Sequence, residues 1–286
     1  MKLDKNLNIL IVGLGLLGGS YAKALSRQGY RVNAITLSQE DIDYALSENM
    51  IAYGTTEINK DLIKSADLVI FALYPTVFLD WIEKHGKLLD EHTVVTDVTG
   101  VKESIVNEVQ SKINAEFISA HPMAGREASG VKNSDDEIFK GANYIVVPTD
   151  KNTEKGIKLC KDLGETLGFA DISELSPEKH DQMIAFLSQL THCIAVSLMC
   201  ANGDPDLVRY TGDSFRDLTR IADINDEMWS ELFLLNKSAL LSEMDAYREA
   251  FDKLYNHIKN DEREDMRNMM KLSSARRKLF GKRKNK

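Results

Sequence analysis

Three glycines near the amino terminus have the types and the spacing of a phosphate-binding turn. Gly13, Gly15 and Gly18 follow the apolar run of residues 9–12 and open a segment that permits a helix. In such a turn the first glycine allows the bend, the second lets the backbone approach a pyrophosphate, and the third lets the helix pack closely on the strand. The helix N-terminus adds unpaired N–H groups and a partial positive charge. The segment therefore predicts a dinucleotide site, with a ligand-free glycine turn as the alternative. Its predicted binding residues are Gly13, Leu14, Gly15, Leu16, Leu17 and Gly18.

The residues after the second predicted strand bear on which dinucleotide is bound. Sites specific for NAD place an acid there, about 20 residues past the glycines, where it bonds the ribose 2′-hydroxyl and repels a 2′-phosphate. This chain has Thr36 and Ser38 instead, and its first acid is Glu40. Both hydroxyl groups can bond either a hydroxyl or a phosphate. We therefore expect Thr36 and Ser38 to contact a cofactor that is NAD or NADP, with weak discrimination between the two.

His121 is the candidate general base of the sequence. It follows the predicted strand 116–120, and ligands of open α/β sheets bind outside the carboxyl ends of the strands. Pro122 keeps the preceding residue extended. An imidazole that titrates near pH ~6.5 is the ordinary base for a hydroxyl proton. A histidine before proline is by itself more often structural, but its placement opposite the glycine turn favours catalysis.

Three arginines are candidate ligands for a carboxylate, because a guanidinium can bind both of its oxygens. They lie in residues 208–224 together with three aspartates. We expect one of Arg209, Arg216 and Arg220 to be functional and two to form structural ion pairs.

The remaining histidines do not suggest a metal centre. His180 and His192 have no third ligand at metal-binding spacing, so no metal site is predicted. His85, His92 and His257 lie in polar surroundings near predicted helix ends and are predicted to be surface residues.

The elements that must position these residues change character near residue 174. Up to that point strand and helix signals alternate, which predicts a doubly wound, Rossmann-type α/β sheet. The expected strands after the first are 31–36, 67–73, 93–98, 116–120 and 143–147, and the expected helices after the first are 41–49, 61–66, 75–89, 101–113 and 153–167. Ser176 and Pro177 then begin a helix, and helical periodicity continues to about residue 279.

The second half is therefore predicted to be all-helical. Its first helix, residues 177–200, is apolar around most of its circumference, so it must be buried in its own bundle or against a second subunit. We expect a homodimer built around these helices. The predicted organisation is a dinucleotide-binding domain at 1–174, a helical dimerisation and substrate domain at 175–279, and a basic disordered tail at 280–286.

Composition excludes several classes of protein. The chain of 286 residues is 43% hydrophobic and 28% charged, and its apolar runs fall short of the ~18 residues of a spanning helix. No signal peptide is visible at the start, and the three cysteines form no CxxC pair. The net charge is −8, and residues 271–286 hold eight basic residues and no acid, so the remaining body is strongly acidic and would repel nucleic acid. We expect a cytoplasmic protein without a membrane or nucleic-acid partner.

Four segments together resemble the prephenate dehydrogenase family of tyrosine biosynthesis. They are GLGLLGGS at 13–20, DVTGVK at 97–102, HPMAG at 121–125 with Glu127 and Ser129-Gly130, and DLTRIA at 217–222. The resemblance implies a Rossmann-type domain joined to a helical dimerisation domain. It also implies oxidative decarboxylation of prephenate to 4-hydroxyphenylpyruvate, with hydride passing to NAD or NADP.

The resemblance also implies roles for single residues. His121 matches the family's catalytic histidine, and Arg220 matches the arginine that binds a substrate carboxylate. Glu127 matches an acid at the mouth of the pocket, His192 matches a second-domain histidine that faces it, and Trp229 matches a tryptophan near that site.

Two positions depart from the family pattern. Many members have serine at the position of Gly100, where it orients the histidine and the nicotinamide, so Thr99 or a water would have to replace it. Gln189 falls where some members have a histidine that contacts substrate; it can form hydrogen bonds but carries no charge. We expect these changes to affect the rate and the choice of substrate more than the reaction.

Three rival functions remain open at the level of the sequence. An arogenate dehydrogenase would use the amino analogue of prephenate. A 3-hydroxyacid dehydrogenase shares the glycine turn and a helical second domain, but the HPMAG segment argues against it. A catalytically silent cofactor-sensing protein is suggested by Gly100 and Gln189.

Overall fold

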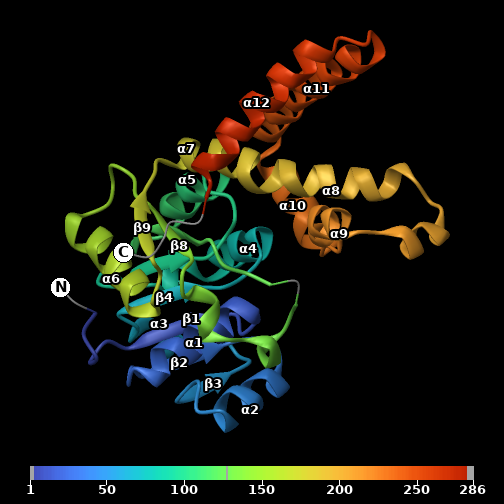
Figure 1. The fold of residues 1–286 in the computed structure, drawn as a ribbon. Helices are drawn as coiled ribbons and strands as arrows, with labels where there is room; N and C mark the ends of the chain where they lie inside the picture. The colour runs from blue at the N-terminus through green and yellow to red at the C-terminus, as the bar shows by residue number, and fades with distance from the viewer. Residues whose placement is uncertain (1–2, 127, 282–286) are drawn as a thin grey trace. The chain divides into compact units, whose positions relative to one another are not determined.

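The computed structural model describes residues 3–126 and 128–281 and contains two compact units, Met1–Lys237 and Ser238–Lys286. The first unit holds two sheets with the helices around them, and the second holds long helices only (Figure 1).

The larger sheet is parallel and has six strands. They are β1 (Ile9–Val12), β2 (Val32–Ile35), β3 (Tyr53–Thr55), β4 (Leu68–Phe71), β5 (Val94–Asp97) and β6 (Glu116–Phe117). The strand order β3-β2-β1-β4-β5-β6 reverses direction between β1 and β4, so the doubly wound Rossmann-type sheet predicted from the sequence is confirmed. Carboxyl ends of parallel strands meet at one edge, which places the loops after β1, β4 and β5 together.

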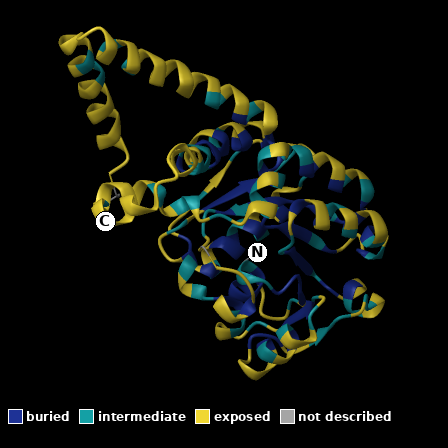
Figure 2. Ribbon diagram, turned by 90° about the vertical axis from the view of Figure 1, so that its right-hand side faces the viewer, coloured by how far each residue is buried: buried dark blue, intermediate teal, exposed yellow. Residues whose placement is uncertain are grey.

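Helices cover both faces of this sheet. They are α1 (Leu16–Arg27), α2 (Gln39–Ser47), α3 (Lys60–Lys64), α4 (Pro75–His85), α5 (Glu103–Lys112) and α6 (Glu154–Leu167), with short 3-10 helices η1 (Gly86–Leu88), η2 (Val131–Asn133) and η3 (Asp136–Phe139). Alternate residues of β1 belong to different apolar clusters, Ile9 and Ile11 to one, Leu10 and Val12 to the other. A strand buried on both sides must be apolar throughout. Figure 2 shows strands of this sheet in the dark blue of buried residues.

A second, smaller sheet corrects the strand predicted at 116–120. The chain leaves the large sheet after Phe117, and β7 (Ser119–Pro122) pairs antiparallel with β8 (Asn143–Val147), which pairs parallel with β9 (Asp171–Glu174). Where the chain leaves the large sheet, the Ser119 hydroxyl and the Ala120 N–H donate to the buried carboxylate of Asp97 at the end of β5. The sequence analysis also missed β3 and β9, which are short and have no buried residue.

From residue 176 the unit is helical. Ser176 accepts the N–H of Lys179 and starts the chain of helices, as predicted. These are α7 (Pro177–Ile184), a π-helical turn η4 (Ala185–Gln189), α8 (Leu190–Ala201), η5 (Pro205–Tyr210), α9 (Asp213–Thr219), η6 (Arg220–Ala222) and α10 (Asp226–Leu235).

The stretch Pro177–Ala201 is long and apolar enough to span a membrane by length and composition, a test that buried and interface helices of globular proteins also pass. Two ways of burying this stretch were expected, in its own bundle or against a second subunit. The single chain provides only part of the first, because Phe186, Leu187, Leu198 and Met199 are exposed.

The second unit consists of α11 (Lys237–Lys259) and α12 (Arg263–Leu279), joined by a turn in which Asp261 has φ 56°. Most of the residues of this unit are exposed (Figure 2). Of the predicted basic tail, 282–286 lie outside the described residues.

The glycine turn after β1 generates a stability prediction. A Cβ added at Gly18 would lie 1.9 Å from the Gly13 carbonyl oxygen, whereas a Cβ at Gly15 would meet nothing within 4 Å. We expect Gly18→Ala to lower the free energy of unfolding by about 2 kcal/mol or more, as overpacking does, and its matched control Gly15→Ala by at most about 1 kcal/mol. Urea denaturation measures both, and equal stability of the two variants would contradict this packing.

Candidate functional site

The glycine turn has the geometry of an anion site. Gly13 has φ +100°, and a Cβ there would lie 2.6 Å from the Ala72 carbonyl oxygen at the end of β4. Gly15 is the N-cap of α1, and a Cβ added there would meet no atom of the protein within 4 Å. The first N–H groups of a helix have no partner within the helix, so those of α1 are directed at this space. A pyrophosphate fits the open position that a Cβ would fill.

Thr36 and Ser38 lie at the exit of β2, as predicted. The hydroxyl oxygen of Thr36 accepts the N–H of Leu14 in the glycine turn at 3.4 Å. That of Ser38 accepts the N–H of Asp41 at 3.2 Å and caps α2. Each hydroxyl keeps its own proton for donation to a ribose hydroxyl or a phosphate. Glu40 is paired with Lys132 Nζ at 2.5 Å, which lowers the pKa of the Glu40 carboxyl.

His121 is the third residue of β7 and is half-buried. Its Nδ1 lies 2.9 Å from Nε2 of His180 in α7. A Cβ added at Gly100 would lie 4.0 Å from His121 Cε1, so Gly100 flanks the ring without contributing a side chain. Burial, followed by the nearby His180 and Lys102, lowers the pKa of His121 well below 6.5. This corrects the expectation that His121 titrates near its ordinary value.

Beneath His121 lies a buried ion pair. Lys102 Nζ donates to Asp97 Oδ2 at 2.9 Å and to the Ala120 carbonyl oxygen at 2.7 Å, and both charged side chains are excluded from solvent. Asp97 also accepts from the N–H of Ala120 at 3.2 Å and from the hydroxyl of Ser119 at 2.5 Å. Burial lowers the pKa of Lys102, and the charge of Asp97 opposes that shift. The pair fixes the backbone of β7 just before His121.

Thr99 belongs to this ion-pair cluster. Its hydroxyl bonds Asp97 and the Val101 carbonyl oxygen and accepts from Lys102 Nζ at 3.2 Å. The sequence-based suggestion that Thr99 orients His121 is therefore corrected, because the partner of the imidazole is His180.

His180 and Asp181 are the site residues that sequence reasoning missed. His180 Nδ1 lies 2.7 Å from Asp181 Oδ1, and both residues are buried. Asp181 accepts the N–H groups of Lys102 and Glu103 at the start of α5, each at 2.9 Å. A His-Asp pair in the first turns after the Ser-Pro helix start was the available signal.

Gln189 is buried and forms hydrogen bonds between helices. Its amide donates to the Leu232 carbonyl oxygen at 3.0 Å and accepts from Asn236 at 2.8 Å, and only 1% of the residue is exposed. Both ends of the amide are therefore engaged inside the protein. The expectation that Gln189 contacts substrate is replaced by a structural role that joins the π-helical turn to α10.

His192 and Trp229, which the resemblance implies near the substrate, lie against each other in the structure. Their rings stack with centroids 3.7 Å apart, and His192 Nδ1 lies 2.8 Å from the Ser188 carbonyl oxygen. Arg220 begins η6, which packs against α8, and is exposed. Glu127 lies outside the described residues.

Of the other arginines, Arg216 pairs with Asp213 at 2.7 Å, as expected for a structural ion pair, and Arg209 is exposed in η5.

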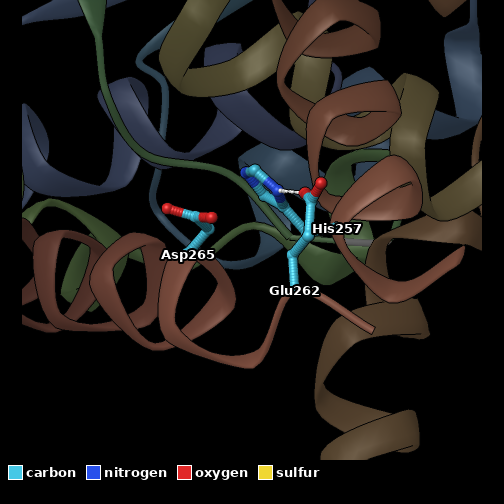
Figure 3. Close-up of side chains that lie close together, drawn as sticks. All are labelled: His257, Glu262 and Asp265. Carbon is cyan, nitrogen blue, oxygen red and sulfur yellow. Dashed lines mark hydrogen bonds and ion pairs between the residues drawn. The ribbon is translucent and has the colours of Figure 1, made fainter. Parts of the chain in front are cut away.

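One group of three potential metal ligands lies close together in the described part of the chain. His257, Glu262 and Asp265 in the second unit offer ligand atoms within 4.8 Å of one another. Figure 3 shows the His257 ring bonded to Glu262, with Nδ1 and the carboxylate oxygen 2.5 Å apart. An ion would have to break that bond, and half-buried His257 is less exposed than the sequence suggested.

Comparisons with known proteins agree with the geometry. The nucleotide-binding domain model of prephenate dehydrogenase matches residues 21–171, and its dimerization domain model matches 176–272. Among similar proteins, the prephenate dehydrogenase of Bacillus subtilis is 28% identical over 90% of this chain and 72% of its own length.

Two solved structures are also similar over nearly the whole chain. The prephenate dehydrogenase from A. aeolicus in complex with hydroxyphenyl propionate and NAD+ is 31% identical over 96% of this chain and 98% of that chain, with a TM-score of 0.89. Synechocystis arogenate dehydrogenase is 26% identical over 96% of this chain and 100% of that chain, with a TM-score of 0.84. With two domain models in sequence order and a relative above 30% identity across both, this chain belongs to the prephenate dehydrogenase family.

Proposed function

We propose that this protein is an NAD(P)-dependent prephenate dehydrogenase of tyrosine biosynthesis, which converts prephenate to 4-hydroxyphenylpyruvate and carbon dioxide. The observation that carries the proposal is His121: an imidazole of lowered pKa, hydrogen-bonded to His180, at the sheet edge where the glycine turn offers a dinucleotide site. Arogenate dehydrogenase is the second candidate, favoured by the similarity to the Synechocystis structure.

The cofactor is held by the glycine turn and by the exit of β2. The backbone from Gly13 to Gly18 and the N-terminus of α1 take the pyrophosphate, and the hydroxyls of Thr36 and Ser38 take the ribose end. When bound, the nicotinamide supplies the acceptor for a hydride.

His121 removes the proton. Its unprotonated nitrogen accepts the proton of the ring 4-hydroxyl as hydride leaves the same carbon, and the carbon becomes a carbonyl. The ring carboxylate is then lost as carbon dioxide, and its bonding electron pair completes the aromatic ring. A base that is neutral across physiological pH is ready for this step.

Residues of the helical domain bind the substrate. Arg220 takes a carboxylate through its guanidinium, and the stacked pair of His192 and Trp229 contributes to the same pocket, as the resemblance implies. Glu127 is assigned the mouth of the pocket on the resemblance alone.

We also propose that the active protein is a cytoplasmic homodimer. The exposed apolar residues of η4 and α8 require a cover, and they lie in the segment matched by the dimerization domain model. In this assignment residues 1–174 bind the dinucleotide and 175–279 form the dimer.

Turnover with prephenate and with arogenate tests the proposal, and His121→Asn tests its base. We expect prephenate to be the better substrate, and the variant to lose about 10²–10⁴-fold in kcat while it still binds cofactor. Because the pKa of His121 is lowered, the acid limb of wild-type kcat/KM should have its midpoint below pH 6.5. Near-normal turnover of His121→Asn would remove His121 from the mechanism, and a clear preference for arogenate would establish the second candidate.

Arg220 should act in binding. Arg220→Ala should weaken substrate binding by about 2–5 kcal/mol if the carboxylate is buried against it, and Arg220→Lys should recover only part, because an ammonium cannot bond both oxygens. Arg216→Ala is the matched control, since Arg216 is paired with Asp213. Steady-state KM and thermal unfolding separate the cases: a normal KM with reduced stability would make Arg220 structural.

The cofactor site should discriminate weakly. Thr36 and Ser38 carry no negative charge, and Glu40 is paired with Lys132, so little repels a 2′-phosphate. We expect kcat/KM with NAD and NADP to agree within about tenfold, or ~1.4 kcal/mol. Thr36→Asp should restore repulsion and favour NAD. A wild-type preference for NAD beyond about a hundredfold, on the same free-energy scale, would mean that an acid occupies the ribose site.

A further inference from the structure

A chain of three buried or half-buried side chains reaches from α7 to His121. Asp181 stands at its far end, where its two oxygens accept the N–H groups of Lys102 and Glu103. His180 lies between Asp181 and His121, with 2.7 Å on one side and 2.9 Å on the other. Each ring nitrogen of His180 therefore has one partner.

The direction of these hydrogen bonds follows from the Asp181 end. A carboxylate can only accept, so His180 Nδ1 carries a proton and donates it to Asp181. Burial, together with the charge of Lys102, lowers the pKa of His180 to about 3, so its ring is neutral and its Nε2 is bare. A bare nitrogen can only accept, so His121 Nδ1 must be the donor in the 2.9 Å contact. His121 is then left with its lone pair on Nε2.

We propose that His180, oriented by Asp181, is a positioning residue that sets the tautomer of His121 so that Nε2 is the basic nitrogen. The inference deepens the proposed function and rests on it, since that reaction needs a bare nitrogen on His121. The opposite tautomer would place two lone pairs, those of His121 Nδ1 and His180 Nε2, 2.9 Å apart. Gly100 beside the ring has no side chain for this task, and the Thr99 hydroxyl is bonded to Asp97 and Val101.

The charges around His121 and His180 favour the neutral form of both imidazole rings. Lys102, at the start of α5, opposes protonation of both histidines. Asp97 at the end of β5 favours protonation but is already paired with Lys102. Burial raises the pKa of the Asp181 carboxyl in α7, whereas the backbone N–H groups of Glu103 and Lys102 oppose that shift and favour its charged, accepting form. The arrangement parallels the way a buried carboxylate fixes a catalytic imidazole elsewhere.

The direct test is the protonation state of His121 in the full-length protein. Histidine ring nitrogen NMR shifts at pH 7.5, assigned with His121→Asn, report which nitrogen carries the proton. We expect a single tautomer with the proton on Nδ1. The NMR measurement needs no turnover, so it reports the tautomer of His121 even if the protein proves inactive on prephenate.

Variants separate positioning from mere packing. His180→Phe keeps a ring but no acceptor, and should leave His121 as a mixture of tautomers. Its kcat should fall about tenfold to a hundredfold, less than the about 10²–10⁴-fold for loss of the base itself, with both KM values nearly unchanged. His180→Gln offers an amide oxygen as acceptor and should restore much of the tautomer and of kcat. His92→Gln, at an exposed histidine far along the chain, is the control.

The outcomes are decisive in each arm. A wild-type His121 with its proton on Nε2 would overturn the inference, as would an unchanged tautomer in His180→Phe. If His180→Phe fails to fold, Asp181→Asn takes its place, because an amide nitrogen facing His180 Nδ1 would favour the reverse order of donors. Activity on prephenate together with the wrong tautomer would leave the proposed function standing and refute only the role of His180.

Discussion

The buried ion pair of Lys102 and Asp97 is the interaction on which the rest of the structure depends. Both side chains are excluded from solvent, and such a pair gains little unless further hydrogen bonds satisfy its remaining donors and acceptors. Here the Ser119 hydroxyl and the Ala120 N–H donate further hydrogen bonds to Asp97, and the Ala120 carbonyl oxygen accepts one from Lys102 Nζ. These hydrogen bonds hold Ser119 and Ala120 beside the ion pair and so fix β7, the strand that carries His121.

The same lysine links the sheet to the helical segment. Its backbone N–H, with that of Glu103, binds Asp181 in α7, and Asp181 in turn holds His180 against His121. One residue thus sets the position of the base from β7 and the orientation of its ring from α7. The low pKa of His121 has the same origin, since burial and the charge of Lys102 both disfavour the imidazolium. A base made in this way is neutral before substrate arrives.

Features that depend on local pattern could be predicted from the sequence. The glycine turn, the buried parallel strands and the Ser176 helix start each follow from a few adjacent residues, and the structure has them. Contacts between distant residues could not be predicted. His180 lies 59 positions from His121, and Gln189 lies 43 and 47 positions from Leu232 and Asn236. The neighbouring sequence therefore does not indicate the roles of His180 and Gln189. The hydrogen bonds of Ser119 and Ala120 to Asp97 likewise span 22 and 23 positions.

The central claim is that buried hydrogen bonds and charges hold His121 neutral and directed before any ligand binds. The pKa of His121 in the free, full-length protein, measured by NMR titration of the assigned imidazole, tests it most directly. The account predicts a pKa clearly below 6.5, with His180 remaining unprotonated over the same range. A pKa of His121 at or above 6.5 would show that the imidazole is ordinarily solvated, and would contradict the account.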